Sequence, residues 1–459
     1  MVFSSITFLF VFLPLFLVCY VILPWRNLVA LSFSLLFFAW GEGTYLLLLL
    51  ATITLNHQVG RWVRDPRWGR LALATGVAVN LAILAWYKYL VFIMVDVLRL
   101  PPLAEPPHLP IGLSFFIFQS ISYLVDVRRG TAPRARSWFD LALYISMFPQ
   151  LIAGPIVRYQ SVAEAIRRRV VSAGDVYRGC VLFATGLAAK VLVANNVAVT
   201  ADAVFALEPE QLSSAAAWTG ALAYSLQIYF DFAGYSLMAI GIGRFMGFRF
   251  PRNFNHPYAA HSVTDFWRRW HISLSTWFRD YVYIPLGGNR KGPARTYANL
   301  FVVFVLCGLW HGAAWVFLAW GLYHGGLLVA ERAGLERLLL RLWAPLRHAY
   351  TLLAVLVGWV LFRAEDIHQA GRFLATLFVP ANPSRPESLA ALVSHESAFF
   401  MLVGVACSVP FWRVLPFSAG AGNSALARPA ALAASLAALL VCSVYVMSGG
   451  YNPFIYFRF

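Results

Sequence analysis

The sequence predicts an all-α, polytopic integral membrane protein. Hydrophobic residues make up 60% of the 459 residues and charged residues only 12%, and the mean hydropathy is +0.68. Soluble domains carry about 25% charged residues, and disordered chains are also rich in charge, so the composition excludes both classes. Because the segments do not show the short alternating pattern of barrel strands, we expect the membrane to be crossed by helices.

Apolar stretches recur along the whole chain and set the number of expected membrane helices. A helix needs about 20 apolar residues to cross about 30 Å of hydrocarbon. Several stretches are shorter than this or are broken by Gly and Pro, so we expect roughly ten to twelve membrane helices, some of them re-entrant. The stretches cover residues 5–23, 28–58, 71–99, 111–126, 138–153, 177–201, 215–241, 297–310, 312–330, 349–363, 397–412 and 427–447.

The first stretch is expected to be a retained membrane helix. Residues 1–24 lack the basic region that opens a secretory signal. They are followed by Pro24, Trp25 and Arg26, whereas a signal peptidase site needs small residues. We therefore do not expect this helix to be removed.

The polar connections differ in charge, and this difference predicts their orientation. Arg-rich connections occur at 61–70, 128–136 and 158–178, whereas 101–110 and 202–211 contain acidic residues and no Lys or Arg. Basic loops collect in the cytoplasm, so the two acidic loops are expected outside. The net charge of +16 would suggest nucleic-acid binding in a soluble protein. Here the positive-inside rule accounts for it, and no nucleic-acid partner is predicted.

The segment from Arg244 to Arg295 combines charge with aromatic residues. It contains nine basic and two acidic residues, with many Trp, Tyr and Phe among them. Such a mixture predicts a structured segment at the cytoplasmic interface, where it contacts membrane lipid. No repeat or low-complexity tract interrupts the chain. We therefore expect residues 1–459 to form one integral-membrane domain, with its distinctive blocks in 111–325.

His311 is the sharpest candidate for a functional residue. It lies in an apolar run, FVVFVLCGLWHGAAWVFLAWG, that contains no Lys, Arg, Asp or Glu. Ionisable side chains inside such a run are costly and are functional candidates by default. Gly308 and Gly312 leave room for a ligand or a neighbouring helix. The alternative interpretation is a structural histidine that makes a hydrogen bond between helices.

Other ionisable side chains give weaker signals. Asp265 and Arg269 are four residues apart and are expected to pair on a helix, on which His271 and Ser275 would share a face. His271 is a catalytic candidate, or it belongs to an interfacial helix that binds lipid headgroups. His324 is a weaker candidate of the same kind as His311. Asp231, a lone acid in an apolar run, is expected to pair with an Arg or to cap a broken helix.

Several kinds of chemistry are not supported by any motif. The five cysteines are scattered, without the paired spacing of a metal or disulfide motif. The sequence contains no HExxH zinc motif, no phosphate-binding glycine loop and no GxSxG nucleophile elbow. We therefore predict no bound metal or cofactor. A buried histidine without a nucleophilic partner instead suits a general base that activates a bound hydroxyl.

Long blocks of the chain resemble the membrane-bound O-acyltransferase (MBOAT) family, and within it the alginate O-acetylases. In the central and C-terminal parts the blocks include TDFWRRWHISLSTWFRDYVYIPLGGNR (264–290), LCGLWHGAAW (306–315) and NPFIYFRF (452–459). Earlier blocks are MVFSSITFLFVFLPLFL (1–17), SFFIFQSISYLVDVRRG (114–130), MFPQLIAGPIVRY (147–159) and QIYFDFAGYSLMAIGIGRFMGFRFPRNFNHPY (227–258).

This resemblance implies a fold and an activity. It implies a ring of helices around a thinned centre, with the histidines near a tunnel through the bacterial inner membrane. By this resemblance, His311 matches the histidine of the family that is most clearly catalytic, and His271 matches a second histidine of the family pattern. The implied reaction moves an acetyl group from acetyl-CoA or a similar thioester toward an exported polysaccharide such as alginate. Periplasmic acetyltransferase proteins are the implied partners.

Other functions stay open at this point. The same blocks fit O-acetylation of peptidoglycan or another surface glycan, and D-alanyl transfer to teichoic acid. A non-catalytic transporter is the alternative from a different class, with Asp231 as a charge near the membrane midplane.

Overall fold

The computed structural model describes all residues except 153, 380–382, 411–426 and 454–459. The described residues form helices and loops without a strand. Among these described residues, six helical stretches are long and apolar enough to cross a membrane, as expected of a multi-pass, all-α membrane protein. Residues 454–459 of the last block and 411–412 of the stretch 397–412 lie outside the described part. The six stretches are Arg26–Trp62, Gly69–Tyr89, Ala173–Phe205, Gly292–His311, Ala344–Arg363 and Arg428–Met447.

The chain divides into two compact units. The first contains Met1–Ala184 and Tyr235–Arg252, and the second contains Thr185–Gly234 and Asn253–Phe459. Two helices pass from one unit to the other, namely α9 (Ala173–Ala188) and α11 (Ser214–Phe245).

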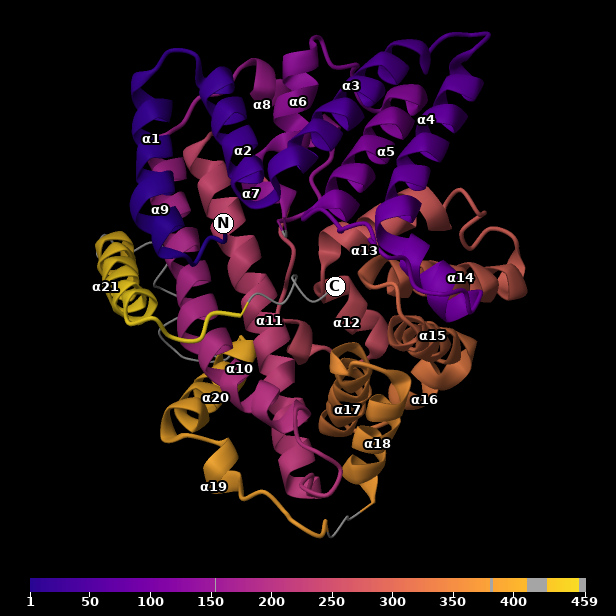
Figure 1. Cartoon of the computed structure of the whole chain (residues 1–459), viewed down its shortest axis with the longest axis vertical. Coiled ribbons are helices and arrows are strands. Elements are labelled where there is room, and N and C mark those ends of the chain that lie inside the picture. Colours follow the sequence, from indigo (N-terminus) through magenta and orange to yellow (C-terminus); the bar gives the residue numbers. More distant parts are fainter. Residues whose placement is uncertain (153, 380–382, 411–426, 454–459) are drawn as a thin grey trace. The chain divides into compact units, whose positions relative to one another are not determined.

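The first unit is built mainly from the N-terminal helices (Figure 1). In chain order they are η1 (Phe8–Phe12), α1 (Leu13–Ile22), α2 (Arg26–Glu42), η2 (Gly43–Tyr45), α3 (Leu46–Trp62), α4 (Gly69–Leu84), η3 (Ala85–Tyr89), η4 (Phe92–Val97), α5 (Leu113–Arg129), α6 (Trp138–Ser146), α7 (Phe148–Leu151), α8 (Tyr159–Arg167) and most of α9.

The apolar stretch 28–58 is two helices rather than one. α2 ends at Gly43, which has φ +50°, a conformation that glycine adopts without steric cost. α2 and α3 then run in opposite directions. The start of α2 and the end of α3 therefore lie at the same end of the unit, where α8 also lies (Figure 1). Arg64 donates to the carbonyl oxygens of Val127 and Ala132 at 2.8 and 2.9 Å. The basic connections 61–70 and 128–136 are therefore fastened together at this end.

The second unit contains the remaining helices (Figure 1). They are η5 (Ala189–Ala194), α10 (Asn195–Phe205), the first part of α11, η6 (Pro257–Ala259), α12 (Val263–Arg269), α13 (Ile272–Phe278), η7 (Arg279–Tyr283), α14 (Gly292–His311), α15 (Trp315–Ala330), η8 (Glu331–Leu335), α16 (Glu336–Leu339), α17 (Ala344–Arg363), α18 (Ile367–Phe378), α19 (Leu389–Leu392), α20 (His395–Ser408) and α21 (Ala427–Met447).

α14 and α15 form a hairpin that packs backbone against backbone. A Cβ atom at Gly308 would collide with the carbonyl oxygen of Phe317, and one at Gly321 would collide with that of Phe304. Small residues allow membrane helices to approach this closely. The close approach fixes the position of the last turn of α14, where His311 lies.

Within the segment 244–295, which was predicted to be structured, residues 253–283 form four short helices joined by tight connections. These helices are η6, α12, α13 and η7, and none of them is among the six candidate membrane spans. Phe266 is fully buried and Trp270 is 3% exposed. The short helices of this segment bring His271 into the interior of the second unit.

Candidate functional site

His271 occupies a sharp break between two short helices. α12 ends at Arg269 and α13 begins at Ile272, and His271 between them has φ +41°. Asp265 and Arg269 pair at 2.9 Å on α12, as predicted. The expectation that His271 and Ser275 share a helix face is wrong, because the helix does not continue through residue 271. A non-glycine residue in this left-handed conformation is strained and is often found at functional sites.

One hydrogen-bond network fixes the orientation of the His271 ring. Its Nδ1 lies 3.1 Å from Oδ1 of Asn253, which also accepts from the backbone N and the Oγ of Ser273, at 3.2 and 2.9 Å. Since a backbone N–H only donates, the Asn253 atom is an acceptor, and Nδ1 of His271 must carry the proton. This tautomer leaves a lone pair on Nε2, which has no hydrogen-bond partner among the residues that the structure describes.

The surroundings of His271 favour an uncharged ring. The residue is 1% exposed, and Phe232 places its edge against the ring, with centroids 4.6 Å apart. Burial lowers the pKa of His271 well below its usual range, because the charged imidazolium would lose its hydration. At neutral pH the ring is therefore uncharged, and its buried Nε2 is a hydrogen-bond acceptor.

His311 is the last residue of α14 and lies among aromatic rings. It is 8% exposed, and its ring centroid is 4.8 Å from Trp310, 5.2 Å from Trp320 and 5.1 Å from Phe362. Gly312 follows directly, and a side chain there would collide with the ring of Phe317. The imidazole is thus held inside the protein by rings from α14, α15 and α17.

Trp310 links the two candidate histidines. Its ring contacts His311, as described above, and lies 6.2 Å from the ring of His271 between centroids. The structure therefore brings together two histidines that are 40 positions apart in the sequence.

His324 lies in the same aromatic cluster but is enclosed on both sides. Trp267 donates to its Nδ1 at 3.4 Å, and its ring lies 5.1 Å from that of Trp320. The opposite nitrogen, Nε2, abuts Gly358, where any side chain would overlap it. This packing supports a structural role for His324, which holds α15 against α17.

Asp231 pairs with a lysine, so the expectation of an Arg partner or of a broken helix is wrong. It lies within the continuous helix α11, and its Oδ1 is 3.0 Å from Nζ of Lys190, with the two side chains 1% and 3% exposed. Lys190 also donates to the carbonyl oxygen of Pro453. Breaking such a buried pair from one side leaves an uncompensated charge and is strongly destabilising.

Three residues that shape this region were not predicted from the sequence, namely Asn253, Lys190 and Glu331. Asn253 carries no signal of its own in an aromatic and basic segment. Lys190 is a lone charge in an apolar stretch, the same signal that singled out Asp231. Glu331, 1% exposed, follows an apolar run and accepts from the backbone N of Val263 and of Thr264, at 2.7 and 2.8 Å. It thereby caps the start of α12.

Among the described residues, no group of three or more His, Cys, Asp and Glu side chains is arranged to hold a metal ion. The five cysteines are free thiols. The side chains that the site brings together are two buried imidazoles in contact with aromatic rings.

The sequence is similar to those of known proteins. The model of the membrane-bound O-acyltransferase family, MBOAT, matches residues 4–352. A protein from Pseudomonas putida described as "Probable alginate O-acetylase AlgI" is 41% identical over 494 residues and is matched over 100% of both chains. One from Azotobacter vinelandii with the same description is 45% identical over 396 residues, 82% of this chain and 78% of the relative.

A second activity occurs among the relatives. A protein from Helicobacter pylori described as "Peptidoglycan O-acetyltransferase" is 35% identical over 417 residues, 82% of this chain and 79% of the relative. The shared element in these descriptions is transfer of an acyl group to oxygen. With a family match over most of its length and full-length relatives at this identity, the chain belongs to the membrane-bound O-acyltransferase family and is an O-acyltransferase.

Proposed function

We propose that this enzyme moves an acetyl group from a cytoplasmic thioester, acetyl-CoA, toward hydroxyl groups of an exported polysaccharide such as alginate. His311 is the general base and His271 is its partner. The observation that carries the proposal is the contact of both histidine rings with Trp310, inside a membrane enzyme of this family. The transporter alternative is set aside, because the family is one of acyltransferases.

The chemical step needs a group that accepts a proton. As the acceptor hydroxyl oxygen attacks the thioester carbonyl, its proton passes to the His311 imidazole, a C–O bond forms and the C–S bond breaks. The thiolate leaves and takes up the proton. Thiolates are good leaving groups, so the enzyme mainly has to activate the alcohol. A positioned general base contributes roughly 10²–10⁴-fold to such a step.

His271 is proposed to orient the acceptor hydroxyl. With the proton on Nδ1, the ring offers only a lone pair at Nε2. This arrangement favours acceptance of a hydrogen bond from the hydroxyl over donation to the developing oxyanion, which would need a second proton on a ring whose pKa is lowered by burial.

The acceptor is proposed from the relatives. The full-length match to proteins described as alginate O-acetylases favours alginate or a similar exopolysaccharide. The relative described as a peptidoglycan O-acetyltransferase favours peptidoglycan as the second candidate. Periplasmic acetyltransferase proteins that receive the acetyl group are the proposed partners.

We also propose that residues 1–459 act as one domain in the bacterial inner membrane. The family match from 4 to 352 crosses both compact units, which supports this. Shorter apolar helices, Phe8–Ile22 and His395–Ser408, would add partial or re-entrant crossings to the six long stretches. Such additions would bring the total toward the expected ten to twelve helices around a central tunnel.

The test is His311→Ala in the purified protein. We expect release of free CoA in the presence of the polysaccharide and its partner proteins to fall at least a hundredfold, since the proton acceptor is lost, while the melting temperature stays close to that of the wild type. His368→Ala, at an exposed position of α18, is the matched control and should keep full activity. Near wild-type turnover by His311→Ala would refute the general-base role.

The acceptor is tested separately. Deleting the gene should remove O-acetyl groups from the exopolysaccharide, measured by NMR of the secreted polymer, and leave those of peptidoglycan unchanged. The opposite pattern would establish the peptidoglycan alternative. Turnover with a D-alanyl thioester in place of acetyl-CoA would establish the teichoic acid alternative.

A further inference from the structure

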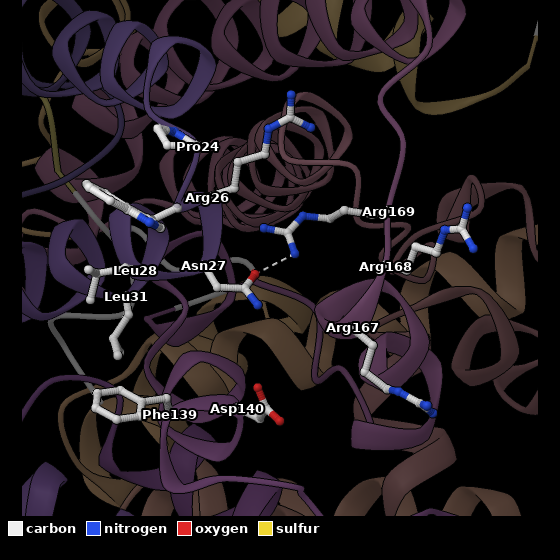
Figure 2. A pocket seen from close by; sticks show the side chains of 11 residues that line it. Pro24, Arg26, Asn27, Leu28, Leu31, Phe139, Asp140, Arg167, Arg168 and Arg169 are labelled. Atoms are coloured by element: carbon white, nitrogen blue, oxygen red, sulfur yellow. Dashed lines mark hydrogen bonds between the residues drawn. The ribbon is translucent and has the colours of Figure 1, made fainter.

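A pocket in the first unit combines a cluster of arginines with apolar side chains. It has a volume of about 670 Å³ and lies between the loop that joins α1 to α2, the start of α6 and the end of α8. Arg26, Arg167, Arg168 and Arg169 line it together with one carboxylate, that of Asp140 (Figure 2). Outside the lining, Glu164 pairs with Arg167 at 3.5 Å, with both side chains exposed to solvent. Even with Asp140 included, the lining carries a clear excess of positive charge.

Arg169 forms the floor of this cluster and lacks one partner. Its guanidinium donates to Oδ1 of Asn27 at 2.6 Å (Figure 2). It also donates to the hydroxyl of Tyr20 at 2.8 Å and to the carbonyl oxygen of Met246 at 2.9 Å. Its second terminal nitrogen, Nη2, is buried and has no acceptor within the described residues. The guanidinium also lies over the ring of Phe248, 4.6 Å from its centroid. Arg169 is therefore held in place within the site, and the exposed guanidinium groups of Arg26, Arg167 and Arg168 are the ones that can meet an anion in the pocket.

The apolar side of the pocket indicates the source of the anion. Trp25, Leu28 and Phe139 line the pocket and are 67%, 52% and 61% exposed. Trp25 and Leu28 lie where the apolar helix α1 ends and α2 begins, and Phe139 lies in the first turn of α6. The end of an apolar helix is a typical place for aromatic residues at a membrane surface. A free phosphate ion would use the arginines alone, whereas a lipid would cover both surfaces.

We propose that this pocket binds the phosphate headgroup of an anionic membrane lipid, with the acyl chains against Trp25, Leu28 and Phe139. Arginine is well suited to phosphate, because its planar group offers several donors in a fixed geometry. The bound lipid fastens the α1–α2 loop to the end of α8. This site is separate from the histidines of the second unit and does not depend on the function proposed above.

The test removes the three exposed arginines, Arg26, Arg167 and Arg168, and leaves Arg169 in its structural contacts. Wild-type protein and the triple variant, with each arginine changed to Gln, are purified in detergent. Each is titrated with phosphatidylglycerol or phosphatidylcholine, and bound lipid is counted by native mass spectrometry. Each basic residue near a membrane surface contributes roughly a factor of five, so the triple variant should bind phosphatidylglycerol about a hundredfold more weakly.

The control has the same loss of charge elsewhere in the first unit. Arg61, Arg67 and Arg70, in the basic connection 61–70, are changed to Gln together, and this variant should keep its affinity for phosphatidylglycerol. Equal losses in both variants, no loss in either, or equal binding of the two lipids by the wild type would overturn the proposal. So would displacement of the lipid by inorganic phosphate or CoA, which would assign the pocket to a soluble ligand. If the triple variant does not fold, Arg168→Gln alone should show a fivefold loss.

Discussion

The network around Asn253 decides what His271 can do. A neutral imidazole donates from one nitrogen and accepts at the other, and the partner of the first nitrogen determines which is which. Here Asn253 accepts from Nδ1 and is itself held by two hydrogen bonds from Ser273. The lone pair of Nε2 therefore points away from this network, and Asn253 acts as a positioning residue.

Changing Asn253 to Asp tests this arrangement through pH. A carboxylate beside Nδ1 favours the charged ring and raises the pKa of His271, typically by 1–3 units for an opposite charge at this distance. A ring with a raised pKa keeps its second proton up to a higher pH, and that proton occupies Nε2. We therefore expect the acid side of the pH–rate profile to move upward by at least about one unit.

The control for this prediction is the same change in a His271→Gln background. Without the imidazole, Asn253→Asp should leave the acid limb where it is. If the limb moves equally in both backgrounds, the titrating group is not His271, and the role of Asn253 is purely structural.

Some properties of these individual residues could be predicted from the sequence, and others could not. Burial of His311 was predictable, because it lies in an apolar run without a charged residue. Burial of His271 was not, because Arg268 and Arg269 lie close to it and an interfacial helix was an open interpretation. The contact between Asn253 and His271 was not predictable either, because the two residues are 18 positions apart and no local pattern specifies the path of the chain between them. Lys190 could have been predicted as the partner of Asp231, because each of them is a lone charge in an apolar stretch.

At the scale of elements, the α14–α15 hairpin holds His311 in place. Gly308 is three residues before His311 and approaches the backbone of α15 at Phe317. Rotation or separation of the two helices would carry the imidazole away from Trp320 and Phe362. The geometry of the site thus depends on a contact that involves no catalytic group.

Gly308→Ala is expected to disturb this hairpin. The added methyl group would overlap the carbonyl oxygen of Phe317, so the helices must separate. Overpacking of this kind typically costs about 1–3 kcal/mol, and we expect a lower melting temperature together with loss of acyl transfer. Gly326→Ala, on α15 with no neighbouring atom within 4 Å, is the matched control and should change neither property. Equal stability of the two variants would contradict the packing argument.

The positions at which helices break were the hardest features to predict from the sequence. The division of 28–58 occurs at Gly43, in the sequence Trp-Gly-Glu-Gly, where glycine gave a usable signal. The break at His271 has no glycine or proline beside it. It is maintained by tertiary hydrogen bonds, including that from the backbone N of Ile272 to the carbonyl oxygen of Asn253 at 2.9 Å. Local preference does not encode such a break.

The basic connections of the first unit gather at one of its ends. The basic connections 61–70 and 128–136 are joined by the hydrogen bonds of Arg64 and of Arg128, whose guanidinium donates to the carbonyl oxygen of Val63 at 2.9 Å. They lie at the same end as the arginine pocket at α8 (Figure 1). A single end that gathers this much positive charge is expected on the cytoplasmic side, where anionic lipids attract it.

Labelling of single cysteines tests this orientation. In a variant without the five native cysteines, Arg134→Cys reports on the basic end and Glu105→Cys on the acidic connection 101–110. With a membrane-impermeant thiol reagent, we expect intact cells to label position 105 and to label position 134 only after permeabilisation, because the basic end stays inside. Acyl transfer by both variants shows that they are folded. Labelling of position 134 in intact cells would reverse the orientation and with it the side from which the thioester donor approaches.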